Sequence, residues 1–499
     1  ACASLSLRLY QLTRPGYVLG VTEYDDGVLF GDALRLVTGV IPYRDFTMVQ
    51  PPGGMLLMVP AALLAKVAGS AWGLAAGRLL TVCADTASVV LLGVLVRHRG
   101  PLTVLLASGL YAVYPDAIVA AHTFLLEPWL NMFCLAGAVL LFDGDRIARA
   151  APRLAWAGAA FGFAVAVKIW ALVPLCVAGL LVVASARRVR PAASLAGGAT
   201  LGLGVPLLPF AVIAPVALVR GVLLGQLLRN VGGSRSPLAR LADLAGLHLL
   251  PVPFSGGTLV VAIGLIAGGC YAVAYLSAGR RPAPLDAYAL LSAVAVTVMF
   301  LWPRLYYPHY GAFDGPFLAL AVALPVGLLA ARPVASRARR LLAPAAALTA
   351  VVLTTAAILQ VRAESRLSGN QVAAAADKII PAGACVLTND SAYTVAADRF
   401  YSDVHGCPAM VDSLGTLFTM TGGRAGEAAA AALRPVAELW QAGLERAGYV
   451  WLTTDTVNQI PWDHRLYAYF RGHFRLAGLA WPHHWSNQDV PRPGLYIRD

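Results

Sequence analysis

An acidic cluster close to the start of the chain could carry out acid/base chemistry. Glu23, Asp25 and Asp26 stand in the stretch EYDDG, directly ahead of an apolar segment. A carboxylate within hydrogen-bond reach of a hydroxyl group can act as its general base. A purely structural use is open for Asp26, which could cap a helix that begins near Gly27.

Four further groups of polar side chains interrupt the apolar sequence. They combine acids, bases, phenols and an amide: Arg44, Asp45, Gln50, Asp116, His122, Glu127, Lys168, Arg304, Tyr306, Tyr307, His309 and Tyr310. Carboxylates beside Lys, Arg, His and Tyr suit a site that binds a phosphate and moves a proton next to it.

Each group also has an ordinary structural explanation. Glu127 before Pro128 is typical of a helix start, and Lys168 could extend its amine to lipid headgroups. The tyrosines could form an interfacial belt, and Asp116 and His122 could be loop residues. The joint pattern favours a site, because ionisable groups at membrane depth cost about 2.5–3.5 kcal/mol each and here both signs occur together.

The composition requires a membrane to position these groups. Hydrophobic residues make up 58% of the 499 residues and charged residues 13%, and the mean hydropathy is +0.68, which excludes an ordinary soluble protein. Long apolar runs predict a polytopic helical membrane protein. Spans are expected at 74–96, 101–118, 126–142, 154–167, 170–185, 192–213, 257–277, 286–301, 312–330 and 342–360.

The basic clusters predict the orientation of the spans. They lie at 97–99, 146–153, 187–190, 280–281 and 332–340, and the positive-inside rule places all five in the cytoplasm. The net charge of +12 is then a topology signal, and no nucleic-acid partner is expected. With this orientation the apolar run 53–69 is a helix at the outer face, and the acidic cluster lies outside as well. A truncated first helix before residue 13 brings the total to about eleven spans.

The last 138 residues, 362–499, predict an exported α/β domain of mixed polarity. Cys385 and Cys407 both lie in it, where a disulfide is permitted, and two unpaired buried thiols are the alternative. The remaining five cysteines lie in apolar segments and are expected to pack in the core.

The order of these motifs resembles the GT-C superfamily of integral membrane glycosyltransferases, in particular the protein O-mannosyltransferases and the lipid A aminoarabinose transferases. The family pattern is an acidic pair in the first outer loop, a Pro-Pro break, an arginine entering the next span, and an acidic residue followed by proline in the next outer loop. A span with a lysine often follows. The corresponding positions here are Asp25-Asp26, Pro51-Pro52, Arg78, Glu127-Pro128 and Lys168. The resemblance covers about residues 17–185 well and the later spans only by topology.

The resemblance implies a transmembrane catalytic domain over 1–361, with outer-face loop helices at 26–69. It also implies a donor sugar linked through phosphate to a polyprenol. Asp25 would be the general base for an inverting attack by an acceptor hydroxyl. Asp26 and Glu127 would orient the acceptor or Asp25. If a divalent cation such as Mg²⁺ or Mn²⁺ is bound, Asp25, Asp26 and Glu127 would hold it. The donor phosphate and lipid would be bound by Gln50, Arg78, Lys168, Arg304, Tyr307 and His309.

The sequence departs from the family pattern at two positions, and two other classes of function remain as alternatives. Gln50 stands where the aminoarabinose transferases carry a lysine, and the acidic pair is Asp-Asp where Asp-Glu is common. A transporter or flippase of lipid-linked sugars would also use intramembrane charges. A noncatalytic membrane scaffold that binds glycan through its exported domain is the other alternative.

The expected location is the cytoplasmic (inner) membrane of a bacterium, with the site and the exported domain on its outer side. The expected partners are the polyprenyl-phosphate sugar, membrane lipid, and an acceptor that is a glycan, a lipid or a protein.

Overall fold

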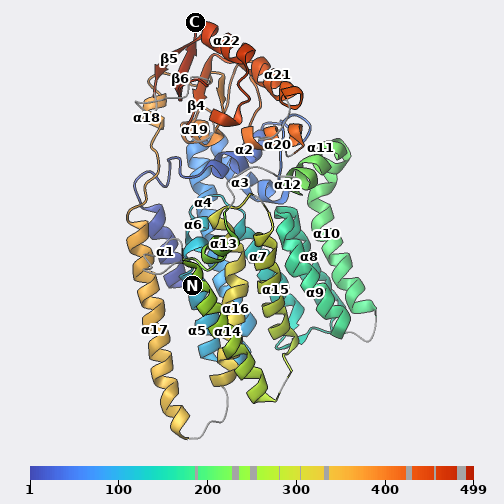
Figure 1. The fold of residues 1–499 in the computed structure, drawn as a ribbon. Helices are drawn as coiled ribbons and strands as arrows, with labels where there is room; N and C mark the ends of the chain where they lie inside the picture. The colour runs from blue at the N-terminus through green and yellow to red at the C-terminus, as the bar shows by residue number, and fades with distance from the viewer. Residues whose placement is uncertain are drawn as a thin grey trace. The chain divides into compact units, whose positions relative to one another are not determined.

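A computed structural model gives the fold, which is mainly helical (Figure 1). It describes residues 1–185, 189–227, 235–247, 256–279, 281–303, 305–330, 336–422, 430–454, 457–479 and 490–499. The chain packs into two compact units. Unit 1 comprises Ala1–Arg14, Leu79–Leu207 and Gly233–Leu367, and unit 2 comprises Pro15–Arg78, Leu208–Gly232 and Ser368–Asp499. The predicted domain boundary at 361/362 lies close to the last junction between the units and stays a prediction.

Unit 1 is a bundle of apolar helices with one short hairpin of two antiparallel strands, β1 (Phe142–Asp143) and β2 (Arg146–Ile147). Its helices are α1 (Cys2–Leu12), most of α4 (Ser70–Val96), η1 (Arg97–Arg99), α5 (Pro101–Ala112), α6 (Pro115–Ala121), α7 (Glu127–Leu141), α8 (Ala151–Val167), η2 (Ile169–Ala171), α9 (Leu172–Ser185), most of α10 (Arg190–Ile213), α13 (Pro237–Leu244), α14 (Gly256–Ala278), α15 (Pro284–Leu301), η4 (Pro308–Tyr310), α16 (Gly311–Ala330) and α17 (Ser336–Glu364).

The predicted class, a polytopic helical membrane protein, is confirmed. Within the described residues, five helices are long and apolar enough to cross a membrane: Ser70–Arg99, Arg190–Ile213, Pro284–Leu301, Pro308–Ala330 and Ala347–Glu364. A total of eleven spans stays a prediction. The predicted span 101–118 is two helices, α5 and α6, that meet at 57°. Pro115 causes this break, because a proline disfavours helical backbone in the residue before it and begins α6 without an N–H.

Unit 2 contains a four-stranded mixed sheet, which confirms the α/β character expected of the C-terminal part. The strands are β3 (Val386–Thr388), β4 (Tyr449–Leu452), β5 (Phe474–Gly478) and β6 (Gly494–Arg498), in the order β3-β4-β6-β5. The pair β3-β4 is parallel, with Leu387 opposite Val450, and β6 is antiparallel to both of its neighbours. Residues 389–391 and 453–454 therefore follow the carboxyl ends of the two parallel strands.

The helices of unit 2 come from three separate stretches of the chain. They are α2 (Tyr24–Val37), α3 (Gly53–Ala68), the start of α4, the end of α10, α11 (Pro215–Val219), η3 (Arg220–Leu224), α12 (Gly225–Leu227), α18 (Ala373–Ala376), α19 (Ser391–Ala396), α20 (Ser413–Thr421), α21 (Ala430–Arg446), η5 (Val457–Gln459) and α22 (His464–His473). In Figure 1 the blue α2 lies beside the orange α19. Helix α3 has 16 residues, about 24 Å at 1.5 Å per residue, which is short of a 30 Å hydrocarbon core. Its place at the outer face stays a prediction.

The core of unit 2 packs α21 against the sheet. Trp440 and Leu444 of α21 are buried against Leu387 of β3 and Val450 of β4. Cys385, directly before β3, forms a disulfide with Cys407, which ties the segment before α20 to the sheet.

Removal of this disulfide should destabilise unit 2. Its cysteines are 22 residues apart. Without the bridge the unfolded chain gains conformational entropy, which lowers the free energy of the unfolded state by about 3 kcal/mol. Cys385→Ser/Cys407→Ser should therefore lower the thermal unfolding midpoint of the purified protein in detergent. Cys176→Ser, at an exposed unpaired cysteine of α9, is the control. Equal midpoints for the double variant and the control would contradict the prediction.

Candidate functional site

The acidic cluster forms the first turn of α2. The helix begins at Tyr24, so Asp26 lies inside it and Glu23 occupies the N-cap position with an extended backbone. A capping role for Asp26 is therefore not observed. Asp25 and Asp26 both stand in the first turn, where the positive end of the helix dipole favours carboxylates.

A buried ion pair holds this turn in place. Arg78 Nη2 donates to Asp26 Oδ2 at 2.6 Å, and both side chains are fully buried. The same guanidinium donates to the carbonyl oxygens of Gly20 at 2.9 Å and Val18 at 3.0 Å, and to that of Tyr17. Arg78 thus ties the loop before α2 and the helix itself to α4. These bonds occupy both terminal nitrogens of Arg78.

Thr22 completes this arrangement, and the sequence analysis did not single it out. Its hydroxyl accepts from Arg78 Nη2 at 3.0 Å and donates to Asp26 Oδ2, also at 3.0 Å. A threonine four residues before an aspartate at a helix start is too common a pattern to predict such a contact. The contact can be predicted only when the position of Arg78 next to Thr22 is known.

Burial and mutual repulsion shift the ionisation of the cluster. The pKa of Glu23 rises from 4.5 to about 8, mainly because burial disfavours its charged form and then because Asp25 and Asp26 lie close by. Glu23 is consequently mostly protonated at neutral pH. Asp25 is half-exposed and Asp26 is buried.

The first turn of α2 packs on α19, which begins just after the carboxyl end of β3. Gly27 approaches α19 so closely that a Cβ there would lie 1.9 Å from the backbone nitrogen of Ala392. Asp390 caps α19 through that same nitrogen at 3.0 Å and contributes to the raised pKa of Glu23. Tyr24 donates its hydroxyl to Asp412 Oδ1 at 2.9 Å. Ligands of open α/β sheets bind at this edge, outside the carboxyl ends of the strands.

A second buried ion pair lies in unit 1, between Glu127 and Lys168. Lys168 Nζ is 2.7 Å from Glu127 Oε1, and the two side chains are 9% and 0% exposed. Glu127 is in the first turn of α7, and Lys168 follows the last residue of α8, so each charge lies at the helix end that favours it. Among the described residues, Glu127 Oε2 is buried without a hydrogen-bond partner.

Aromatic rings surround this pair. Lys168 Nζ lies 3.5 Å from the ring centroid of Trp170 and 5.2 Å from that of Tyr310, which is the geometry of a cation–π contact. The His309 ring is 5.0 Å from Tyr310 and 5.6 Å from Tyr307, and His309 is close enough to Glu127 for their charges to interact. Trp170 was not singled out in the sequence, although its place two residues after Lys168 was a usable signal.

The other predicted site residues are placed as follows. Gln50 is half-buried in unit 2, and its backbone carbonyl accepts a hydrogen bond from the Tyr43 hydroxyl at 2.6 Å. The side-chain oxygen of Gln50 is buried and has no hydrogen-bond partner among the described residues. Arg304 lies outside the described residues. Asp25, Asp26, Gln50 and Arg78 are thus in unit 2, and Glu127, Lys168, Tyr307 and His309 are in unit 1.

Two of the three carboxylates predicted as alternative metal ligands are engaged by cations. Asp26 is paired with Arg78 and Glu127 with Lys168. In the described ranges, no group of three or more His, Cys, Asp or Glu side chains could hold a metal ion. A divalent cation at Asp25, Asp26 and Glu127 stays a prediction.

Comparison with solved structures identifies the fold. The chain is similar to ArnT from Cupriavidus metallidurans bound to undecaprenyl phosphate, with a TM-score of 0.59 and 14% identity over 99% of this chain and 96% of ArnT. The apo form of that protein gives 0.58 over the same extent. The Archaeoglobus fulgidus oligosaccharyltransferase, tethered with an acceptor peptide containing the NVT sequon, gives 0.50 at 13% identity over 90% of this chain and 68% of its own.

At 13–14% identity this likeness shows that the chain has the fold of these membrane proteins, as the resemblance in the sequence predicted. No protein-family model and no curated protein matches the chain.

Loss of Arg78 should destabilise the protein more than loss of an exposed arginine. Arg78→Met leaves Asp26 as a buried charge without its cation, which typically costs about 3–5 kcal/mol. We expect a clear fall in the thermal unfolding midpoint in detergent, and recovery of most of it in Arg78→Met/Asp26→Leu. Arg434→Met, which breaks an exposed pair with Glu438 on α21, is the control and should change the free energy of unfolding by less than about 1 kcal/mol. Equal effects of Arg78→Met and Arg434→Met on the unfolding midpoint would disprove that the buried Arg78–Asp26 pair stabilises the fold.

Glu23 should make stability depend on pH between about 4.5 and about 8. Because its pKa is higher in the folded state, the folded protein holds this proton more tightly, and the free energy of unfolding falls as pH rises through that window. Glu23→Gln removes the effect, so it should raise the unfolding midpoint at pH 8.5 and leave it nearly unchanged at pH 4.5. Glu445→Gln, at an exposed residue of α21, controls for the added amide. A stabilisation by Glu23→Gln that is equal at both pH values would refute the assignment.

Proposed function

We propose that the protein is a polyprenyl-phosphate-dependent glycosyltransferase that moves a sugar to an acceptor hydroxyl, with inversion, at the outer face of a bacterial cytoplasmic membrane. The fold supports the class, because it matches over nearly its full length that of ArnT, which was solved with undecaprenyl phosphate bound. Within this chain, the observation that carries the proposal is the buried Asp26–Arg78 pair, which fixes the first turn of α2 and so orients Asp25.

Asp25 is assigned as the general base. Its carboxylate takes the proton of the acceptor hydroxyl while the hydroxyl oxygen attacks the anomeric carbon of the donor. The bond between that carbon and the phosphate oxygen breaks on the opposite side, and polyprenyl phosphate leaves with the bonding electrons. Asp26 contributes by position: its bonds to Arg78 and Thr22 hold the turn on which Asp25 stands.

The Glu127–Lys168 pair is assigned to the donor phosphate. Negative charge develops on the leaving phosphate, and a fixed cation nearby lowers the free energy of that state. Lys168 is held by Glu127 and the face of Trp170, so it costs little to position. Gln50, Arg304, Tyr307 and His309 remain proposed ligands of the phosphate or of the polyprenyl chain. No step is assigned to a metal ion.

A transporter or flippase of lipid-linked sugars, and a noncatalytic glycan-binding scaffold, are the alternatives. Transfer of sugar by the purified protein in detergent, where no sealed compartment exists, distinguishes the enzyme from both. A panel of polyprenyl-phosphate sugars, with loss of each donor followed by mass spectrometry, would at the same time identify the sugar.

Replacement of the base tests the mechanism. Asp25→Asn should lower the transfer rate at least 10²-fold, since general-base catalysis contributes about 10²–10⁴. Binding of the polyprenyl-phosphate donor and the thermal unfolding midpoint should stay close to those of the wild type. Glu438→Gln, an exposed acid-to-amide change on α21, should leave transfer unchanged. Retention of transfer by Asp25→Asn would exclude Asp25 as the base.

A further inference from the structure

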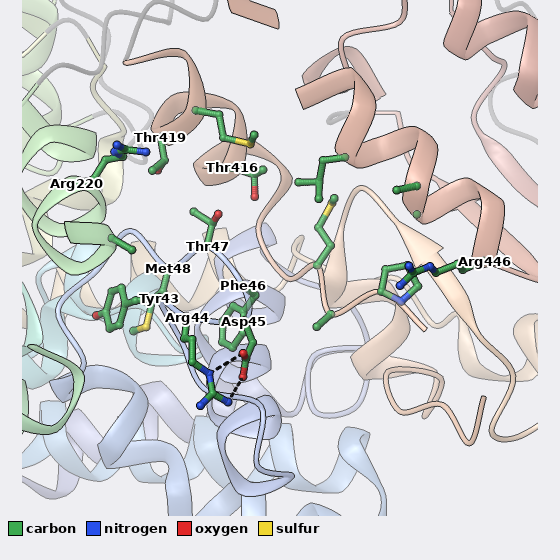
Figure 2. A pocket seen from close by; sticks show the side chains of 18 residues that line it. Tyr43, Arg44, Asp45, Phe46, Thr47, Met48, Arg220, Thr416, Thr419 and Arg446 are labelled. Atoms are coloured by element: carbon green, nitrogen blue, oxygen red, sulfur yellow. Dashed lines mark hydrogen bonds and ion pairs between the residues drawn. The ribbon is translucent and has the colours of Figure 1, made fainter. Parts of the chain in front are cut away.

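A cavity of about 410 Å³ opens within unit 2, and none of the residues assigned to transfer lines it. Its walls come from residues 43–48 before α3, from α11 and η3, and from residues 408–410 together with α20 and α21 (Figure 2). Sites for small molecules commonly have volumes of about 300–1,000 Å³. The cavity is therefore large enough for a ligand of moderate size.

Most of the lining is apolar and adaptable. Met48, Met410 and Met420 line the cavity together with Phe46 and Leu439. Methionine side chains are unbranched and polarizable, so they pack against flexible apolar groups of varied shape. The lining suits an alkyl or prenyl chain better than a sugar ring, which would need many hydrogen-bond partners.

The charged side chains at the cavity carry an excess of positive charge. Three arginines line the cavity: Arg44, Arg220 and Arg446. Asp45 is the one carboxylate in the lining, and it pairs with Arg44 at 2.8 Å. Figure 2 shows Arg220 and Arg446 at opposite ends of the cavity. Neither has a carboxylate within 4.0 Å in the described part of the chain.

Hydrogen-bonding capacity is also left over at the cavity. Thr419 Oγ1, on α20, is buried without a hydrogen-bond partner among the described residues. An arginine such as Arg220 and an unsatisfied hydroxyl favour an anionic group such as a phosphate, which accepts several charge-assisted bonds.

One wall of the cavity belongs to a segment with an exposed apolar surface. Ala217 and Arg220 line the cavity from α11 and η3, and on this segment Val216 is 69% exposed, Val219 50% and Leu223 44%. Val212, at the end of α10, continues this surface at 73%. A helical segment that exposes apolar side chains beside an arginine is typical of the membrane interface.

We propose that this cavity binds an anionic amphiphile from the membrane, with its phosphate or carboxylate at Arg220, its chain among the methionines, and Arg446 adding positive potential at the other end of the cavity. This site is additional to the one proposed for transfer and does not depend on that function. The wall formed by α11 and η3 explains how a lipid reaches it, because the same segment would lie in the lipid interface.

Direct binding measurements on the purified full chain in detergent test the proposal. Three probes separate the contribution of the anionic group from that of the alkyl chain. They are dioctanoyl phosphatidic acid, uncharged dioctanoylglycerol, and inorganic phosphate. Phosphatidic acid should bind saturably and at least tenfold more tightly than either of the others, by titration calorimetry or native mass spectrometry. This ranking would show that both the charge and the chain contribute.

Two variants locate the binding. Arg220→Gln/Arg446→Gln should weaken phosphatidic acid at least tenfold, and the fold should persist because both arginines are exposed. Ala442→Trp, at an exposed position of α21 that lines the cavity, should block the chain and abolish binding. Arg434→Gln/Arg446→Gln is the matched control: it removes the same charge but keeps Arg220, so it should weaken binding less than the other double variant.

Three results would overturn the proposal. They are equal affinity for dioctanoylglycerol and phosphatidic acid, affinity for inorganic phosphate as high as for phosphatidic acid, and unchanged binding in both Arg220→Gln/Arg446→Gln and Ala442→Trp. Because no sugar donor is present, these outcomes are independent of whether the protein transfers sugar.

Discussion

The buried contact between Arg78 and Asp26 is the constraint on which the start of unit 2 depends. A guanidinium without access to water needs partners for its donors, and here backbone carbonyls and two side chains of residues 17–26 bind both terminal nitrogens of Arg78. The loop and α2 can thus occupy one position relative to α4, since any other leaves a buried charge without its partners. A residue on the first turn of α2 inherits this rigidity, which suits a group that must reach a substrate precisely.

The ion pair in unit 1 is built differently, and the difference suggests different uses. The terminal nitrogens of Arg78 are occupied by protein oxygens, so this arginine acts through position. Lys168, by contrast, contacts one carboxylate oxygen and the face of Trp170, and an ammonium group has three donors. Glu127 also retains a buried oxygen without a partner in the described residues. The ammonium of Lys168 therefore has donors left for the phosphate that we propose, whereas the terminal nitrogens of Arg78 do not.

Features that depend on composition or local order could be predicted from the sequence, and features that depend on tertiary approach could not. Long apolar runs predicted the helical membrane class, and a C-terminal segment of mixed polarity predicted the small sheet. The bond from Tyr24 to Asp412, and the approach of Gly27 to Ala392, join residues more than 360 positions apart, and no local pattern encodes them. For the same reason unit 2, which combines three stretches of chain, was not foreseen.

The electrostatics of the acidic cluster explain how three neighbouring carboxylates can stand together in one turn. If all were ionised, their repulsion would oppose both folding and the approach of an anionic donor. Asp26 is neutralised by Arg78, and Glu23, with a pKa of about 8, carries a proton near neutral pH. Asp25, half-exposed in the first turn of α2, stands where the helix dipole favours the ionised form. Asp26 thus fixes the turn and Glu23 limits the charge, which leaves Asp25 for the role of general base that we propose.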